Sequence, residues 1–287
     1  MPGIAMKRQL LLKSLLLFLL FFWVNSSVAE TPVRPIGEYF QGEVMKYDID
    51  FWIFSRVAEG VVTFRSLGGG RYEAFHEAKT LGLAGLVTRY RRDTYRSVMG
   101  TINNGRRLIP LRFEEDVVIG STIRKRTTVF DYAARKVTID TQKEDGNSRE
   151  EVEIPYGTLY EDPMTAFYNF RFGVYDKVEP GKIFTIRTVP RKESPQPIIL
   201  AVAPKKEEEQ RRSEENEKEG KDLFIKVRLD KEFVGSLSGE VEVWFSKDII
   251  PMTGVAKDVL LYGDIQGRLT YRGFPNSAEK NLPPQKP

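Results

Sequence analysis

Apolar and polar residues alternate with a period of two along most of the chain. Met45, Tyr47 and Ile49 fall on one face of an extended segment, and residues 223–229 and 265–271 show the same alternation. This period is typical of β-strands with one buried face and one solvated face. The sequence therefore predicts a protein built mainly from antiparallel strands.

Turn residues separate the alternating segments. Residues 68–70, 103–105 and 145–147 each combine Gly with Asn, Asp or further Gly, which favours tight hairpin turns. Hairpins at this spacing indicate a meander of about a dozen strands, and a sheet of that size curls or closes on itself. We expect a mainly β fold, either a curved antiparallel sheet or a partly open β-barrel.

One segment, residues 161–173, has helical spacing instead. Asp162 is a candidate N-cap, Pro163 suits the first helical position and Gly173 ends the helix. Four residues at i, i+3, i+4 and i+7 share one helical face: Met164, Phe167, Tyr168 and Arg171. We expect one main helix packed on the sheet by this face, with Phe167 and Tyr168 buried and Arg171 at the rim of any cavity.

Arg171 has two possible roles. In the last turn of the helix it can bind the C-terminal carbonyls and complement the helix dipole. Alternatively, it faces a cavity between helix and sheet and binds an anionic head group. The candidate ligand-binding residues are Phe167, Tyr168, Arg171 and His76.

His76 is the only histidine, and it shares a strand face with Tyr72 and Ala74. We interpret it first as a partly buried structural residue. With one His and no Cys, a metal site would need a carboxylate cluster, and we expect neither a metal nor a cofactor. The acidic residues 114–116 favour a solvated turn, because adjacent strand residues point to opposite faces. Catalytic residues remain unknown, and the sequence favours a protein that is not an enzyme.

The first 29 residues are typical of a secretory signal. Three basic residues precede an apolar run at 15–24, and Ser27 and Ala29 supply small residues at positions −3 and −1 of a cleavage site after Ala29. The run of about ten residues is too short to span a bilayer core of about 30 Å. We expect a periplasmic or secreted protein, and an uncleaved N-terminal anchor is the alternative.

The net charge changes once the signal is set aside. Three of the 44 Lys and Arg residues lie in the predicted signal, and none of the 40 Asp and Glu residues does. The remaining chain is almost neutral, so it lacks the basic excess of a nucleic-acid-binding protein. We expect a monomer without a nucleic-acid partner.

The domain boundaries follow from composition. We predict a linker at 30–39, a single β-rich domain at 40–273 and a disordered Pro-rich tail at 274–287. Residues 204–222 are rich in Lys, Arg and Glu, and we interpret them as a charged insertion at the tip of a hairpin. Because this segment has no apolar face, we predict that it does not dock on the sheet and can be removed without loss of stability.

Several motifs, in this order, resemble an exported bacterial family catalogued as domain of unknown function 3108. They lie at residues 40–43, 78–80, 92–95, 104–110, 162–171 and 239–251. The resemblance covers roughly residues 40–272, apart from the charged insertion. It implies export and a curved β domain, but no reaction, since the family has no assigned activity. The general shape is similar to that of periplasmic lipoprotein carriers, an analogy of fold alone.

These observations favour a non-enzymatic periplasmic binding or cell-envelope maintenance protein. It would hold a lipid, a lipoprotein or a glycan in an apolar pocket between the sheet and helix 162–172. The alternative is a carbohydrate-active enzyme that uses paired carboxylates. Aliphatic and aromatic pocket walls would favour the binding protein, whereas two facing acids with stacking aromatic residues would favour the enzyme.

Overall fold

The computed structural model describes residues 34–51, 54–190, 197–214, 220–259 and 263–275. The predicted signal with its cleavage position after Ala29 lies outside the described residues, as does most of the predicted Pro-rich tail. All strands and helices described below belong to one compact unit, Pro35–Pro287.

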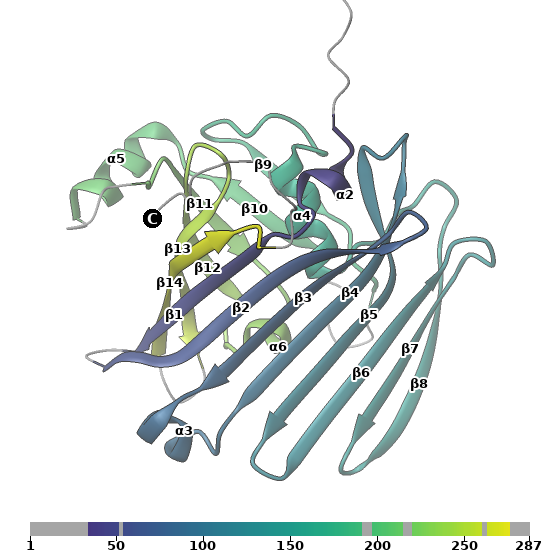
Figure 1. The fold of residues 1–287 in the computed structure, drawn as a ribbon, viewed down its shortest axis with the longest axis horizontal. Coiled ribbons are helices and arrows are strands. Elements are labelled where there is room, and N and C mark those ends of the chain that lie inside the picture. Colours follow the sequence, from purple (N-terminus) through teal and green to yellow (C-terminus); the bar gives the residue numbers. More distant parts are fainter. Residues whose placement is uncertain (1–33, 52–53, 191–196, 215–219, 260–262, 276–287) are drawn as a thin grey trace, which may run out of the picture. The chain divides into compact units, whose positions relative to one another are not determined.

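In the described part of the chain, 14 strands form a single antiparallel sheet (Figure 1). Their order across the sheet is β8-β7-β6-β5-β4-β3-β2-β1-β14-β13-β12-β11-β10-β9. The strands are β1 (Val44–Phe51), β2 (Phe54–Gly68), β3 (Arg71–Thr80), β4 (Arg92–Ile102), β5 (Arg107–Ile119), β6 (Thr122–Asp131), β7 (Lys136–Lys143), β8 (Gly146–Glu153), β9 (Ile183–Ile186), β10 (Ile198–Val202), β11 (Leu223–Arg228), β12 (Glu240–Phe245), β13 (Pro251–Val259) and β14 (Gly263–Gly273). This architecture confirms the predicted mainly β fold with a curved antiparallel sheet.

Local sequence explains most of the sheet. In β2 every second residue is buried, from Ala58 to Phe64, as the period of two requires. The predicted turn at residues 103–105 joins β4 to β5, and Asn103, Asn104 and Gly105 all have positive φ there, a conformation that Asn and Gly tolerate best. Among the described strands, the one pairing between strands far apart in sequence joins β1 to β14, and it unites two meanders into one sheet.

Helix α4 (Pro163–Phe172) forms where the sequence predicts it. The Asp162 carboxylate accepts hydrogen bonds from the backbone N–H groups of Met164 and Thr165, and Gly173 ends the helix with a φ of 81°. These are the N-cap and C-terminal glycine features that define helix limits. The predicted start and end of the helix are therefore confirmed.

The sheet packs against α4 from two sides, not one. Met164 and Tyr168 belong to an apolar cluster with residues of β1–β7. Ala166 and Phe170 belong to a second cluster with residues of β9–β12, including Phe184. The prediction of a single buried face was too narrow, because the sheet bends around the helix and covers most of its circumference.

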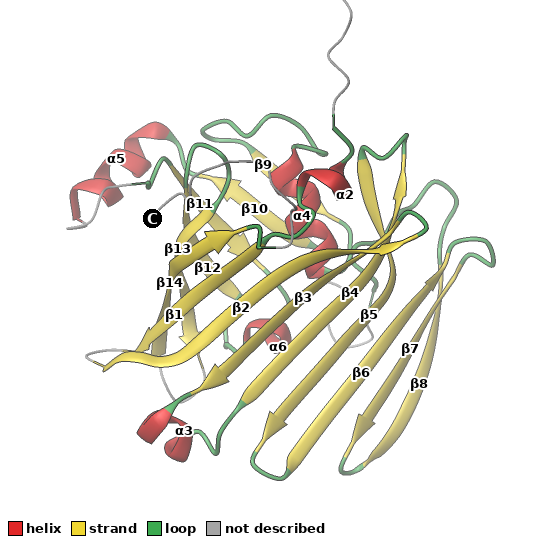
Figure 2. Cartoon of the chain, in the orientation of Figure 1, coloured by secondary structure: helices red, strands yellow, loops and turns green. Residues whose placement is uncertain are grey.

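Four further helical elements lie in the described part of the chain. They are α2 (Ile36–Tyr39), α3 (Gly82–Val87), α5 (Lys205–Glu214) and α6 (Lys231–Val234). Figure 2 shows α4 and α6 within the curve of the sheet and α5 outside it. The inner face of the sheet therefore carries helices of very different size, since α4 has ten residues and α6 has four.

The prediction of a linker at 30–39 does not hold for residues 34–39, the part of it that the structure describes. Ile36 of α2 is fully buried, its backbone N–H donates to the carbonyl of Gly105 at 2.8 Å, and Phe40 is 1% exposed. The β-rich domain thus begins at about Pro35. The sequence around Ile36 has no periodicity, so its contact with a turn some seventy residues further on left no local signal.

The prediction that the charged insertion cannot dock was wrong. Helix α5 covers the outer faces of Phe224 and Trp244, which are each 3% exposed. The guanidinium of Arg211 lies 5.4 Å from the Phe224 ring centre and that of Arg212 lies 5.2 Å from the Trp244 ring centre. Arginine can stack on aromatic rings while its charge stays hydrated, so a helix without apolar residues still packs.

Candidate functional site

A cavity of about 50 Å³ lies on the inner face of the sheet. The inward side chains of β5–β7 form one wall, the N-terminal end of α4 a second and α6 with its flanking loop a third. Its lining includes three aromatic residues, Phe113, Phe130 and Phe233, and four acidic residues, Glu115, Glu161, Asp162 and Asp230. A space of this size holds a few water molecules, whereas small-molecule pockets measure about 300–1,000 Å³.

Asp162 is the acid at the N-terminus of α4. Besides the two helix N–H groups, its carboxylate accepts hydrogen bonds from the hydroxyls of Ser97 and Thr165, both at 2.7 Å. Burial raises the pKa of Asp162 to about 6, and these donors limit the rise. The side chain therefore fixes the helix to β4 and titrates close to neutral pH.

The neighbouring acid, Glu161, is the centre of a second polar cluster. Its carboxylate pairs with Arg107 at 2.5 Å and accepts hydrogen bonds from the Asn169 amide at 3.0 Å and from the Tyr175 hydroxyl. Asn169 also bonds both the N–H and the carbonyl of Leu108, each at 2.9 Å. This cluster joins α4 to the start of β5 and leaves the Glu161 carboxylate fully engaged.

Arg171, at the other end of α4, lies in a buried ion pair. Its two terminal nitrogens contact the two oxygens of Glu43 at 2.7 Å each, and its Nε donates to the carbonyl of Ile249 at 3.2 Å. Arg272 of β14 adds a third contact to Glu43 at 2.8 Å. Although burial favours the neutral acid, the two guanidinium groups hold the pKa of Glu43 below its ordinary value.

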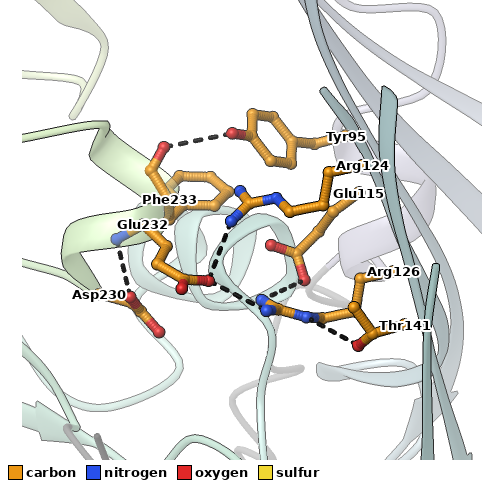
Figure 3. A network of polar contacts seen from close by, with 8 residues as sticks. All are labelled: Tyr95, Glu115, Arg124, Arg126, Thr141, Asp230, Glu232 and Phe233. Atoms are coloured by element: carbon orange, nitrogen blue, oxygen red, sulfur yellow. Dashed lines mark hydrogen bonds and ion pairs between the residues drawn. The ribbon is translucent and has the colours of Figure 1, made fainter. Parts of the chain in front are cut away.

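A fourth polar network connects α6 to the inner face of the sheet (Figure 3). The Glu232 carboxylate contacts Arg124 at 3.1 Å and Arg126 at 3.0 Å, two inward residues of β6. Arg126 also contacts Glu115 at 3.5 Å. Burial disfavours the charged guanidinium, yet the carboxylates of Glu115 and Glu232 raise the pKa of Arg126.

Phe233 completes the contact of α6 with the sheet. Its ring centre lies 4.4 Å from that of Tyr95, and the Tyr95 hydroxyl donates to the Phe233 carbonyl at 3.2 Å. Figure 3 shows both residues beside the arginines of β6. An aromatic side chain and a carboxylate from the same helical turn therefore occupy neighbouring positions on the inner face.

The structure brings three of the four predicted site residues together. Tyr168 is fully buried, Phe167 is half-buried, and the guanidinium of Arg171 lies over both rings at 5.5 and 5.1 Å. His76 lies apart from them on β3, where its ring stacks on Tyr95 at 5.8 Å, and burial lowers its pKa. A ligand-binding role for these residues stays a prediction.

The expected position of Arg171 needs correction. We predicted this residue at the rim of a cavity, with a carbonyl cap or an anionic ligand as its partner. Its side chain is 2% exposed, and Glu43 satisfies its charge. The pairing of β1 with β14 brings Glu43 and Arg272 to the helix, and no local pattern in the sequence predicts that pairing.

Sequence reasoning missed Arg124, Arg126 and Glu232. In β6 the inward face carries Arg124, Arg126 and Thr128, whereas the outward face carries Ile123 and Lys125. Both faces mix polar and apolar residues, so the alternation does not indicate which one is buried. The useful signal was the Asp230 N-cap with Gly235 four residues after Lys231, which marks the single turn of α6.

Two further observations concern broad classes of protein. In the described residues, no helix is long and apolar enough to cross a membrane. Within the same part of the chain, no three His, Cys, Asp or Glu residues gather as a group that could hold a metal ion.

Fold and site together define a β-rich protein whose curved open sheet surrounds one central helix and a small cavity of mixed polarity. Residues 46–263 match the family described as "Protein of unknown function (DUF3108)", and the chain belongs to this family. This match confirms the resemblance found in the sequence motifs. No curated protein and no solved structure matches the chain.

Proposed function

We propose that this protein is a non-enzymatic binding protein of the bacterial cell envelope that holds an amphiphile, such as a lipid, between the sheet and helix α4. The observation that carries the proposal is the composition of the inner face next to α4. Phe113, Phe130 and Ile139 form an apolar wall there, and the guanidinium groups of Arg124 and Arg126 lie beside it. An apolar wall with a few convergent charges suits a molecule with a tail and a head group.

The predicted signal peptide supports the envelope as the site of action. An exported protein without Cys has no disulfides, so its stability comes from the core around α4. We infer that α4 keeps the two halves of the sheet apart, which leaves room on the inner face beyond the N-terminal end of the helix.

The first test is a search for a bound molecule. The full chain is expressed with its own leader, purified without detergent and examined by native mass spectrometry, and the sample is then extracted with organic solvent. We expect a non-covalent adduct with the mass of a lipid that passes into the extract. A bare protein mass, together with an empty extract and no uptake of added lipid, would contradict the proposal.

A matched pair of variants locates the bound molecule. Thr128 lines the cavity and is 4% exposed, whereas its neighbour Thr127 lies on the outer face of the same strand. Thr128→Trp should fill the space and remove the adduct, and Thr127→Trp should leave it unchanged. Equal adduct levels in the two variants would place the ligand elsewhere.

One observation favours a second candidate, an acid-dependent hydrolase: four carboxyl groups line the cavity. We rank it lower because the described contacts engage these acids structurally. Glu161 and Asp162 accept the hydrogen bonds that hold α4, and Glu115 pairs with Arg126. Hydrolysis of a panel of chromogenic glycosides that disappears in Glu115→Gln would reverse this ranking.

A further inference from the structure

Helix α6 places a carboxylate and an aromatic ring side by side on the inner face. An anionic amphiphile has the same two parts, a charged head and an apolar tail. The Glu232 carboxylate lies between Arg124 and Arg126, and the Phe233 ring packs on Tyr95 and lines the cavity (Figure 3). Charged guanidinium groups bind carboxylates and phosphates through the same donors. The helix therefore occupies both a head-group position and the beginning of a tail position.

The residues beneath α6 are more deeply buried than α6 itself. The side chains of Arg126 and Glu115 are 10% and 3% exposed, whereas that of Glu232 is 41% exposed. Helix α6 has four residues, and none of them is buried. Since a partly solvated carboxylate contributes little to an ion pair, the ion pairs of Glu232 hold this helix only weakly.

The ends of the α6 segment are suited to movement. Gly235 follows the helix with a φ of 71°, and Gly239 closes the loop with a φ of 72° and a hydrogen bond from Leu229 N–H to its carbonyl at 2.9 Å. The segment between them is held to β13 through the Leu237 N–H and the carbonyl of Asp258 at 3.0 Å. Displacement of residues 230–235 would leave the β11–β12 hairpin intact.

We propose that α6 is a plug, and that an anionic amphiphile binds the inner face by displacing it. The ligand's carboxylate or phosphate takes the place of Glu232 between Arg124 and Arg126, and its apolar tail takes the place of Phe233 against Tyr95 and Phe113. This inference rests on the proposed function and adds to it the charge of the ligand and the element that guards the site. It also explains how a cavity of about 50 Å³ admits a larger molecule.

The test uses three probes with equal tails and different heads: dodecanoate, dodecyl phosphate and dodecyltrimethylammonium. Binding to the full chain is measured by titration calorimetry below the concentration at which each probe forms micelles. We expect both anionic probes to bind and the cationic probe to bind at least about tenfold more weakly, since the arginines repel it. The ratio between the carboxylate and the phosphate shows which head the arginines prefer.

Variants of the plug give the decisive comparison. A ligand that competes with α6 binds more tightly when the plug is weakened, because the open fraction of the protein rises. Phe233→Ala should strengthen dodecanoate binding by about fivefold or more, and Glu232→Gln, which removes only a partly solvated ion pair, by about twofold. Glu240→Gln is the matched control, since it removes the same charge from an exposed position on β12 and should leave binding unchanged. Arg124→Gln should remove the preference for anionic probes.

Amide hydrogen exchange reports the displacement itself. The N–H groups of Phe233 and Gly235 donate to the carbonyls of Asp230 and Lys231 at 3.0 and 2.8 Å. Dodecanoate should accelerate exchange at these two amides and slow it in β4–β6, while the Leu237 amide, which is bonded to β13, should keep its rate. Slower exchange at the α6 amides would show a ligand bound with α6 in place, which would overturn the plug.

The outcomes separate the two proposals. If the wild-type protein binds the probes but the α6 variants bind no more tightly, the plug is wrong and the proposed binding function stands. If neither the wild-type protein nor any α6 variant binds a probe, the proposed function fails, and the plug with it. Circular dichroism melts confirm that each variant is folded.

Discussion

Helices α4 and α6 lie against the same inner face, and both join it through an ion pair between Arg and Glu. Those two ion pairs differ in their exposure to water. In the α4 pair the side chains of Arg171 and Glu43 are 2% and 0% exposed, whereas in the α6 pair those of Arg126 and Glu232 are 10% and 41% exposed. The same chemistry therefore serves a permanent contact in one place and a replaceable one in the other.

The difference arises because water competes for exposed charges and not for buried ones. Breaking a buried pair leaves an uncompensated charge in a medium of low polarity, which costs several kcal/mol. Breaking the α6 pair returns the Glu232 carboxylate to water at little cost, while Arg126 keeps its contact with Glu115. Helix α4 is thus the structural centre of the sheet, and α6 is the element that can move.

The largest change in the free energy of unfolding is expected when the buried ion pair of α4 is broken. Arg171→Ala leaves the Glu43 carboxylate buried beside Arg272 alone, and we expect a loss of about 3–5 kcal/mol in the free energy of unfolding. Urea denaturation measures it. Glu43→Gln added to this variant should restore part of the loss. A loss under about 1 kcal/mol would mean that Arg171 acts only on the helix dipole.

The contribution of Asp162, at the start of α4, to stability should depend on pH. Its pKa of about 6 in the folded protein exceeds the ordinary 3.8, so the folded state binds this proton more tightly. The contribution of Asp162 to stability therefore falls as pH rises from about 4 through about 6, by about 1–3 kcal/mol.

Asp162→Asn removes this titration while Asn still accepts the N-cap hydrogen bonds. The difference in unfolding free energy between wild type and variant should decrease as pH rises across that interval, measured by urea denaturation at several pH values. A difference that grows with pH would mean that the hydrogen-bond donors outweigh burial.

Helix α5 provides a third case, in which charged residues pack from outside the sheet. Replacing Arg211 and Arg212 by Ala removes their stacking on Phe224 and Trp244, and we expect a loss of about 1–2 kcal/mol for the pair. Thermal melts measure it, with Lys205→Ala and Lys206→Ala on the same helix as the control. Equal losses in the two double variants would attribute the effect to the removed positive charges and not to stacking.

The smallest effect is expected at α6. Glu232→Gln should change the free energy of unfolding by less than about 0.5 kcal/mol, because its carboxylate is partly solvated. Urea denaturation beside Arg171→Ala gives the direct contrast between the two helices. A loss above about 2 kcal/mol would make α6 part of the core and would remove the distinction on which the plug depends.

The sequence by itself determined the local elements of this protein. The period of two in β2 and the Asn103–Gly105 turn follow from which residues tolerate a pleat or a positive φ. The limits of α4 follow from Asp162 and Gly173, which complete the hydrogen bonds that a helix end leaves open. These features depend on neighbours a few residues apart, so a single sequence contains them.

Only the tertiary structure decided which residues meet across the sheet. The β1–β14 pairing brings Glu43 to Arg171, 128 residues away, and to Arg272, 229 residues away. Burial of Phe224 on an outer face depends on α5, and the inward position of Arg124 depends on the register of β6. The sequence around a charged or aromatic strand residue is the same whether water or another element covers that residue. The free energy that decides between the two comes from contacts that the chain forms only when it folds.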